Sequence, residues 1–428
     1  MSTRMQSDME IDRVATIFKG KHVLVTGGTG FMGKVLVEKL LRLTQLEKIY
    51  MLMRVKKGKI LTERLNDMFS NPLFDLLKQQ MDIKTIISKI QVIEGDVAEA
   101  NLGISIENRN LITDNVSLIY HCAATIRFDE KLKKAIELNT RGTKLMIELA
   151  LECKNLDLFG YMSTAFIKGH EIFLLEKAYD PPTDPQKIIK SMELLNNSEI
   201  DLMETKILLT APNTYTFTKA LAEALVYDAC EKQGLPVLVI RPSIVIPTYQ
   251  EPIPGWTDNL NGPMGLFIGI GQGVIRTVYC DYTLCGNFIP VDIAINGLMV
   301  STWHHLTQSL MKIHNKITKS MSVLDYYSTH QWNFDDKALK MIQKKLNKTE
   351  KLKYKIDADG MDGEKYFEDC VLGARRYLMK QGDERLPQAR KMMRIMYWVD
   401  IICKALIYGG LLYWTSGCFI PIGQFTKL

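Results

Sequence analysis

A glycine-rich turn between an apolar run and a helical pattern is the feature that most constrains how this chain can fold. Val23–Val25 predicts a short strand, and Gly27, Gly30 and Gly33 follow it before apolar residues recur at helical spacing from Lys34. The first glycine permits a tight turn, the second lets backbone N–H groups approach a pyrophosphate, and the third lets the helix lie close to the strand. The sequence therefore predicts a dinucleotide-binding turn. Its candidate ligands are Thr26, Gly27, Gly28, Thr29, Gly30, Phe31, Met32 and Gly33.

Short aliphatic runs alternate with helical patterns over the first 245 residues, which predicts an α/β fold with a doubly wound parallel Rossmann sheet. Strands are expected at 23–25, 49–53, 90–93, 118–120, 158–162 and 237–240, and helices at 34–43, 132–152 and 215–233. Residues 184–210 are expected to be a helical insertion. Pro242–Gly273 is rich in Gly and Pro, so it is expected to be largely loop, and this includes the glycine run Gly269–Gly273. Both segments could cover a substrate.

The end of the second strand indicates which nucleotide binds. Arg54 stands there, followed by Lys56 and Lys57, where an NAD site would place an acidic residue for the ribose hydroxyls. A guanidinium can hold a 2′-phosphate with two charge-assisted hydrogen bonds, so the sequence predicts NADPH as the cofactor. A solvated basic turn is the alternative. Weaker candidates for the same site are Asp96, after the third strand, and Cys122, Ala123 and Ala124, after the fourth.

Tyr215 and Lys219 are the candidate catalytic pair. They stand four residues apart in a helical pattern, so both side chains lie on one face. Ser163 and Thr164 follow the fifth strand, where hydroxyls would emerge beside a bound nicotinamide. Reduction of a carbonyl creates an oxyanion, which needs a proton donor and hydrogen bonds. Tyr215 would donate the proton, Lys219 would lower its pKa and hold the ribose, and Ser163 or Thr164 would fix the carbonyl oxygen. The alternative makes Tyr215 a surface aromatic.

Further motifs extend along most of the chain. Thr26–Glu38, Tyr161–Phe166, Tyr215–Glu223, Arg241–Ser243 and Pro254–Asn259 resemble segments of the extended short-chain dehydrogenases, and more narrowly of the animal-type fatty acyl-CoA reductases. Residues 331–335 and 366–378 resemble the small, male-sterility-type C-terminal domain of that family. The resemblance implies reduction of a long-chain acyl-CoA to a primary alcohol by two NADPH, through a hemithioacetal and a bound aldehyde. Arg241 to Val245 would line the nicotinamide side, with Pro242 and Ser243 as cofactor contacts.

The C-terminal part of the chain predicts a membrane attachment. Ala405–Thr426 has no charged residue and approaches the length of a bilayer-spanning helix, although Gly and Pro within it leave an interfacial segment open. The basic residues before it would hold the body on the cytosolic side. They are Arg375, Arg376, Lys380, Arg385, Arg390, Lys391 and Arg394. Membrane lipid is therefore an expected partner, and the family suggests the peroxisomal or endoplasmic reticulum membrane.

Composition excludes several other classes of protein. The net charge of +6 is mild and no basic stripe contains interleaved aromatics, so nucleic acid is not an expected partner. The eight cysteines show no metal-ligand or disulfide spacing, and no metal is expected. A different extended reductase, acting on a sterol, sugar nucleotide or aldehyde, remains an alternative, as does an NADP-binding membrane scaffold without activity. A homodimer is left open.

The expected organisation has five parts. A tail covers 1–20, the NADP-binding Rossmann domain with substrate-covering insertions covers 21–300, and a helical C-terminal domain covers 324–394. A membrane-anchoring segment covers 395–428. The connector at 301–323 is shorter than the family pattern, which leaves open whether the acyl pocket is complete.

Overall fold

A six-stranded, wholly parallel sheet forms the centre of the protein. The computed structural model describes residues 12–402 and 404, with gaps at 56–57, 169–170, 172, 209–210, 282, 308–332, 379, 389, 396 and 399. The strand order is β3-β2-β1-β4-β5-β7, the doubly wound order of dinucleotide-binding folds. The strands are β1 (His22–Thr26), β2 (Lys48–Met53), β3 (Ile90–Glu94), β4 (Leu118–His121), β5 (Leu158–Met162) and β7 (Val237–Ile240). All six predicted strands and the Rossmann fold class are confirmed.

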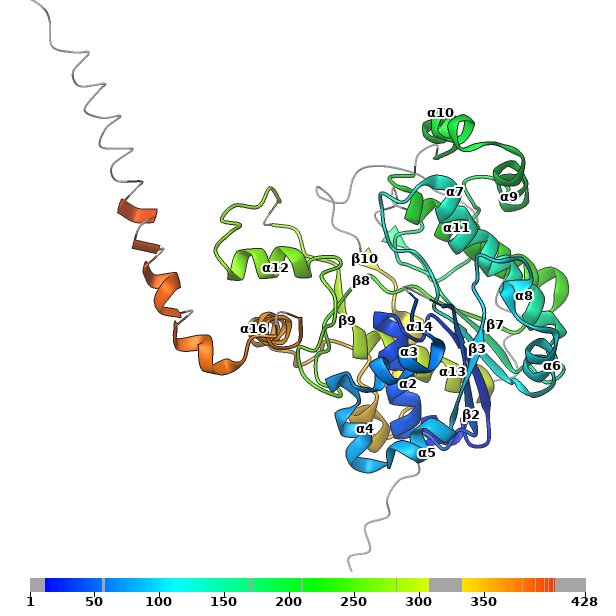
Figure 1. Cartoon of the computed structure of the whole chain (residues 1–428), viewed down its shortest axis with the longest axis horizontal. Helices are drawn as coiled ribbons and strands as arrows, with labels where there is room; N and C mark the ends of the chain where they lie inside the picture. The colour runs from blue at the N-terminus through cyan, green and yellow to red at the C-terminus, as the bar shows by residue number, and fades with distance from the viewer. Residues whose placement is uncertain are drawn as a thin grey trace, which may run out of the picture.

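Helices cover both faces of this sheet (Figure 1). On one face Val23 and Val25 pack into a core shared with α2 (Phe31–Leu43) and α13 (Val291–Thr307). On the other face Leu24 packs into a second core. That core is shared with α6 (Ile106–Asn115), α8 (Gly142–Glu152) and α11 (Thr214–Gln233). Because β1 is buried on both faces, its sequence is a continuous apolar run rather than an alternating one.

The shorter helices fill the crossovers. In the β2–β3 crossover they are α3 (Leu61–Phe69), η1 (Pro72–Phe74), α4 (Asp75–Gln80) and α5 (Ile83–Ser88). Elsewhere they are α1 (Arg13–Thr16), η2 (Ala100–Gly103), α7 (Leu132–Ala135) and the π-helical turn η3 (Ile136–Arg141). The predicted helix at 132–152 is thus confirmed, with a π-helical turn in its middle.

The two predicted insertions differ in outcome. Residues 184–210 contain α9 (Pro185–Leu194) and α10 (Asn197–Leu208), as expected. Pro242–Gly273 is largely loop, as expected, but the prediction of a loop for the glycine run Gly269–Gly273 is wrong at its start. It contains β8 (Ile244–Ile246), which pairs with β9 (Phe288–Pro290), and α12 (Met264–Gly271), which includes Gly269 and Gly271 of the glycine run. The helix forms because its apolar side chains gain partners: Phe267 packs edge-on against Phe288 and Phe367.

Part of the C-terminal region packs into the main core, whereas Tyr366 and Cys370 pack with Ile246 in a small separate cluster. The boundary predicted at residue 300 falls inside α13, which is buried from Val291 to Trp303. Ile342, Leu346 and Tyr354 belong to the same hydrophobic core as β1 and α2. The C-terminal elements are β10 (Asn333–Phe334, paired with β6, Phe173–Leu174), α14 (Lys337–Lys344), α15 (Lys348–Lys353), α16 (Gly363–Gly373), η4 (Ala374–Leu378) and η5 (Asp383–Arg385).

Most of the predicted membrane segment lies outside the described residues. Ala405–Thr426 lies outside the described residues, as do residues 308–323 of the predicted connector and Lys56 and Lys57. Among the residues that the structure describes, no helix combines the length and apolar character needed to span a bilayer.

Candidate active site

The turn between β1 and α2 is fixed by close backbone packing. Gly27 has a φ of +70°, and a Cβ added to it would lie 2.8 Å from the backbone nitrogen of Ala123. A Cβ on Gly33 would lie 2.1 Å from the carbonyl oxygen of Gly27, so only glycine lets α2 start this close to the strand. Gly30 is the N-cap of α2, and no side chain caps that helix. Its first N–H groups are therefore suited to an anion such as a pyrophosphate.

The loop after β8 packs onto the start of the same helix. Trp256 is fully buried, its ring stacks on Phe31 at 5.5 Å, and its Nε1 donates to Asn71 Oδ1 at 2.9 Å. Asp258 forms an ion pair with Lys34. The predicted cofactor ligand Phe31 is thus half-buried, with one side of its ring packed on Trp256.

Two arginines gather at the end of β2. Arg54 Nη1 donates to Asp96 Oδ2 at 3.0 Å, and the Arg54 side chain is 48% exposed. Arg64, from α3, donates to Thr29 Oγ1 at 3.2 Å and to the carbonyl oxygen of Arg54. Burial lowers the pKa of Arg64, and the nearby Arg54 charge lowers it further by a smaller amount. Arg64 was not predicted from the sequence, although its position in the first helix after β2 could have suggested it.

Behind the turn, a buried hydrogen-bond chain positions the end of β4. Thr26 Oγ1 lies 2.7 Å from His121 Nδ1 and accepts from the Ala123 backbone N–H at 3.2 Å. Burial lowers the pKa of His121 to about 3, so its imidazole is neutral at physiological pH. Thr26, predicted as a cofactor ligand, is fully buried and supports the segment Cys122–Ala124 from below. Those three residues are half-buried beside Gly27.

Tyr215 and Thr164, two of the predicted catalytic residues, are hydrogen-bonded to each other. Tyr215 lies in the first turn of α11, which Asn213 caps by accepting from the Thr216 backbone N–H at 2.9 Å. Burial raises the pKa of Tyr215 to about 12, while a hydrogen bond with Thr164 lowers it. The phenol is therefore protonated at neutral pH and can act as an acid.

Lys219 lies one turn further along α11 and points to the end of β5. Its Nζ donates to the Met162 carbonyl oxygen at 2.6 Å and lies 3.3 Å from the Tyr161 hydroxyl. The residue is only 3% exposed, and burial lowers its pKa to about 8. The ammonium is thus mostly charged at pH 7 and close to titration.

The second predicted hydroxyl, Ser163, has a different partner. Its Oγ donates to Glu223 Oε2 at 2.5 Å, and Glu223 also forms an ion pair with Arg241 at 2.5 Å. Arg241 in turn donates to the carbonyl oxygens of Leu175 and Lys177. The buried Glu223 carboxylate thus holds the guanidinium of Arg241, and the role of this residue beside the nicotinamide stays a prediction. Glu223 was missed, although it stands eight residues after Tyr215 on the helix face that also presents Lys219.

Pro242 and Ser243 continue from Arg241 beyond the end of β7. Pro242 is buried and its carbonyl oxygen accepts from the Ala165 backbone N–H at 2.9 Å, while Ser243 is half-buried. A third missed residue is Asn139, in the π-helical turn. Its amide bonds to the backbone of Thr125 and donates to Thr218 Oγ1 at 2.9 Å. Asn139 therefore ties the loop after β4 to the helix that holds Tyr215 and Lys219.

Comparison with known proteins gives the family. A sequence model described as male sterility protein, of an NAD-binding type, matches residues 25–298, and a second with that description matches 291–381. The fatty acyl-CoA reductase wat of Drosophila melanogaster is 33% identical and covers 87% of each chain. Fatty acyl-CoA reductase 1 of Homo sapiens is 31% identical, over 91% of this chain and 92% of its own. The chain belongs to the fatty acyl-CoA reductase family. The predicted resemblance is confirmed.

A more distant similarity is found among solved structures. The reductase domain of a non-ribosomal peptide synthetase from Mycobacterium tuberculosis is 20% identical, covers 81% of this chain and 84% of its own, and has a TM-score of 0.48. This similarity is too low to add to the family assignment.

The residues at the carboxyl edge fit a nicotinamide cofactor. In this reductase the uncapped N-terminus of α2 and the glycines at 27, 30 and 33 leave room and N–H groups for a pyrophosphate. Lys219, Tyr215 and Thr164 lie at the ends of β5 and α11, on the same edge of the sheet. The edge thus combines a nucleotide cradle with a buried cation and a protonated phenol.

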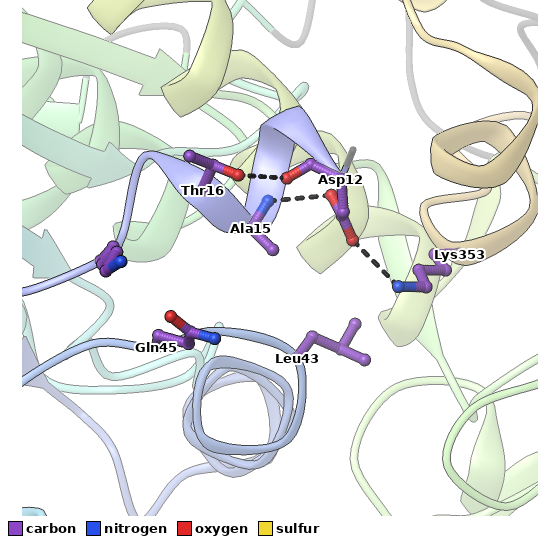
Figure 2. A pocket seen from close by; sticks show the side chains of 7 residues that line it. Asp12, Ala15, Thr16, Leu43, Gln45 and Lys353 are labelled. Atoms are coloured by element: carbon purple, nitrogen blue, oxygen red, sulfur yellow. Dashed lines mark hydrogen bonds and ion pairs between the residues drawn. The ribbon is translucent and has the colours of Figure 1, made fainter. Parts of the chain in front are cut away.

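A separate cavity lies at the opposite edge of the sheet (Figure 2). It has a volume of about 350 Å³ and lies between α1, the end of α2 and α15. Asp12 lines it and pairs with Lys353 at 3.2 Å. This cavity lies at the amino ends of β1 and β2, whereas a Rossmann sheet binds its cofactor at the carboxyl ends of its strands.

Proposed function

We propose that this family member reduces long-chain fatty acyl-CoA to a primary alcohol, with NADPH as the hydride donor. The observation that supports this most directly is the contact of Tyr215 with Thr164, one turn from Lys219 and on the same sheet edge as the glycine turn. Relatives about 30% identical over most of their length are named fatty acyl-CoA reductases. Both the site and the family therefore favour a carbonyl reductase.

The side chains have distinct tasks in this reaction. The bound cofactor supplies a hydride to the thioester carbonyl in the first reduction and to the aldehyde in the second. Thr164 donates a hydrogen bond to the carbonyl oxygen, and Tyr215 transfers its proton as negative charge develops there. Lys219 stabilises the phenolate that remains, and it binds the ribose. No covalent cysteine intermediate is needed, and burial raises the pKa of Cys122 to about 12, which disfavours a thiolate.

The preference for NADPH is assigned to the pair Arg54 and Arg64. The Arg64 guanidinium contacts Thr29 of the glycine turn and the Arg54 carbonyl oxygen, while the Arg54 guanidinium pairs with Asp96. The Asp96 carboxylate already neutralises part of the Arg54 charge, so Arg64 is the better donor to a 2′-phosphate. We therefore extend the proposed cofactor site from Arg54 to include Arg64.

Membrane attachment through residues 395–428 is part of the proposal. The uncharged run Ala405–Thr426 would place the site where acyl chains partition. The body would face the cytosol, at the peroxisomal or endoplasmic reticulum membrane. This location is inferred from the sequence and the family.

Product analysis tests the function. Membranes from cells expressing the protein are given C16 and C18 acyl-CoA with NADPH, and fatty alcohol is measured by gas chromatography. Alcohol is expected from the wild type, and a roughly 10²–10⁴-fold loss of rate is expected for Tyr215→Phe, which removes the proton donor. A Tyr249→Phe variant, an aromatic outside the site, should retain activity. Absence of alcohol from protein that binds NADPH would overturn the proposal in favour of another reductase substrate or a scaffold.

A further inference from the structure

Two segments that are far apart in sequence expose large apolar side chains on one side of the molecule. The loop after α12 exposes Val274 (77%), Val278 and Tyr279 (100%). The helical residues 390–402 expose Met392, Trp398 (60%) and Ile402 among others. In Figure 1 α12 and α16 lie on the same side of the sheet, away from α10. Side chains of this kind are rarely clustered on a surface unless a partner covers them.

The two segments contact each other. A Cβ added to Gly273 would lie 3.6 Å from Met393 Sδ, and Arg276 Nη1 pairs with Asp400 Oδ1 at 2.7 Å. Asp400 also pairs with Lys404 at 2.9 Å, within the same helical stretch. The loop and the helical stretch therefore form one surface, and the charges of Arg276, Asp400 and Lys404 are paired within it.

Charge is concentrated next to this surface. Residues 375–404 contain eight basic and three acidic residues, a net charge of +5, whereas the whole chain has +6. Nearly all of the excess positive charge is thus located in a stretch of 30 residues that contains the apolar helix. Basic residues combined with exposed Tyr and Trp are typical of a segment in the headgroup region of an anionic bilayer.

The sequence that follows the helical stretch also favours a lipid bilayer as the partner of this surface. In the sequence, Ala405–Thr426, a run of about 22 residues without charge, follows shortly after the helical stretch. A protein partner would explain the apolar side chains, but it would not explain why the cationic stretch and the uncharged run are adjacent.

We propose that residues 273–279 and the helical stretch 390–402 lie together in the interfacial region of an anionic lipid bilayer. The body of the protein then contacts the membrane at an internal loop as well as through its C-terminal segment. This inference rests on the membrane attachment included in the proposed function. It adds a fixed orientation, in which α12 and α16 face the lipid and α10 faces the cytosol.

A fluorescent probe in the loop tests this orientation in the full chain. Cys280, next to Tyr279, is exposed, so Cys285→Ser, Cys403→Ser and Cys418→Ser leave it as the main reactive thiol. An NBD group on Cys280 is followed while vesicles of phosphatidylcholine and phosphatidylserine are added, with and without lipid spin-labelled near the headgroup. The emission is expected to rise on addition of vesicles and to be quenched by the spin label.

The matched control is a probe on α10. Leu202 is also apolar and 84% exposed, so Leu202→Cys, combined with Cys280→Ser, should give a probe that the spin label does not quench. Val274→Asp with Tyr279→Asp should lower quenching of the Cys280 probe at least twofold, whereas Leu202→Asp should leave it unchanged. These results would support the proposed surface.

Three outcomes would overturn it: protein that does not bind the vesicles, bound protein whose Cys280 probe is not quenched, and a probe already shielded before lipid is added. The last would indicate a second copy of the chain or another protein on this surface. Fatty alcohol is assayed on the same preparations. Alcohol with an unquenched probe would refute only the membrane surface, and a quenched probe without alcohol would refute only the proposed reaction.

Discussion

The carboxyl edge of the sheet has two parts that are built in different ways. The nucleotide half lies at the end of β1, and the proposed catalytic half lies at the ends of β5 and β7. At the end of β1, the backbone itself fixes the geometry: Gly27 and Gly33 allow contacts that any side chain would block. At the ends of β5 and β7, buried side chains fix it, through the hydrogen bond of Ser163 to Glu223 and the ion pair of Glu223 with Arg241. A site held by backbone contacts depends on the absence of side chains, whereas a site held by buried charges depends on every partner being present.

The largest effect expected within this comparison separates the two adjacent hydroxyls. Thr164→Val should reduce the turnover number roughly 100-fold, because it removes a donor to the oxyanion and the contact with Tyr215. Ser163→Ala should change turnover only a few-fold, because Ser163 bonds to Glu223 instead. It should instead lower stability by about 1–3 kcal/mol, since the buried carboxylate loses a donor. Steady-state kinetics and urea unfolding of both variants measure this, and an inactive, fully stable Ser163→Ala protein would contradict the assignment.

The glycine turn offers a matched pair of substitutions. Gly33→Ala should cost about 1–3 kcal/mol in stability and weaken NADPH binding, because its Cβ would overlap the Gly27 carbonyl oxygen. Gly28→Ala should be milder, because its Cβ would meet only the end of the flexible Met51 side chain, at 2.6 Å. Thermal unfolding and NADPH fluorescence titration compare the two. Equal losses would show that the backbone contact is not what fixes the turn.

In the proposed NADPH site, the two arginines would divide the recognition of the 2′-phosphate. Arg64→Gln should weaken NADPH binding about tenfold and leave NADH binding unchanged, because one charge-assisted hydrogen bond to the phosphate is lost. Arg54→Gln should weaken it less, because Asp96 holds Arg54 and the side chain is half-exposed. Titrations with both cofactors measure the ratio. A larger loss for Arg54→Gln would return the principal role to the residue predicted from the sequence.

The same contrast explains what could be predicted from sequence. The spacing of Gly27, Gly30 and Gly33 is typical of a nucleotide-binding turn, and the six aliphatic runs predict a parallel sheet. The nucleotide half could therefore be predicted from local sequence. The hydrogen-bond partners of Ser163 and Arg241 could not be predicted, because their partner Glu223 belongs to another element. A pattern of residue types does not show which side chains contact each other. Thr164 and Ser163 differ by one position at a strand end, and only the packing of α11 on β5 distinguishes them. The helix α12 was missed because Gly and Pro surround an apolar segment whose partners, Phe288 and Phe367, are distant in sequence.

The smallest expected effect is a pH dependence that arises from Lys219. Burial lowers the pKa of this ammonium to about 8, so in the cofactor-free protein its charge is present below that pH and lost above it. Affinity for NADPH should therefore fall about fourfold between pH 7 and 8.5, and a Lys219→Met variant should bind more weakly but show no such dependence.

Stability should change in the opposite direction over the same titration. The pKa of Lys219 is lower in the folded protein than the ordinary value of 10.5, so the unfolded chain binds more protons between about pH 8 and 10.5. The contribution of Lys219 to the stability of the cofactor-free protein should thus rise with pH across that window, and this rise should be absent in Lys219→Met. Urea unfolding of both proteins at several pH values measures the difference. If the two proteins have the same pH profile, Lys219 is not the group that titrates, and the catalytic half would not depend on a buried cation in the way its geometry indicates.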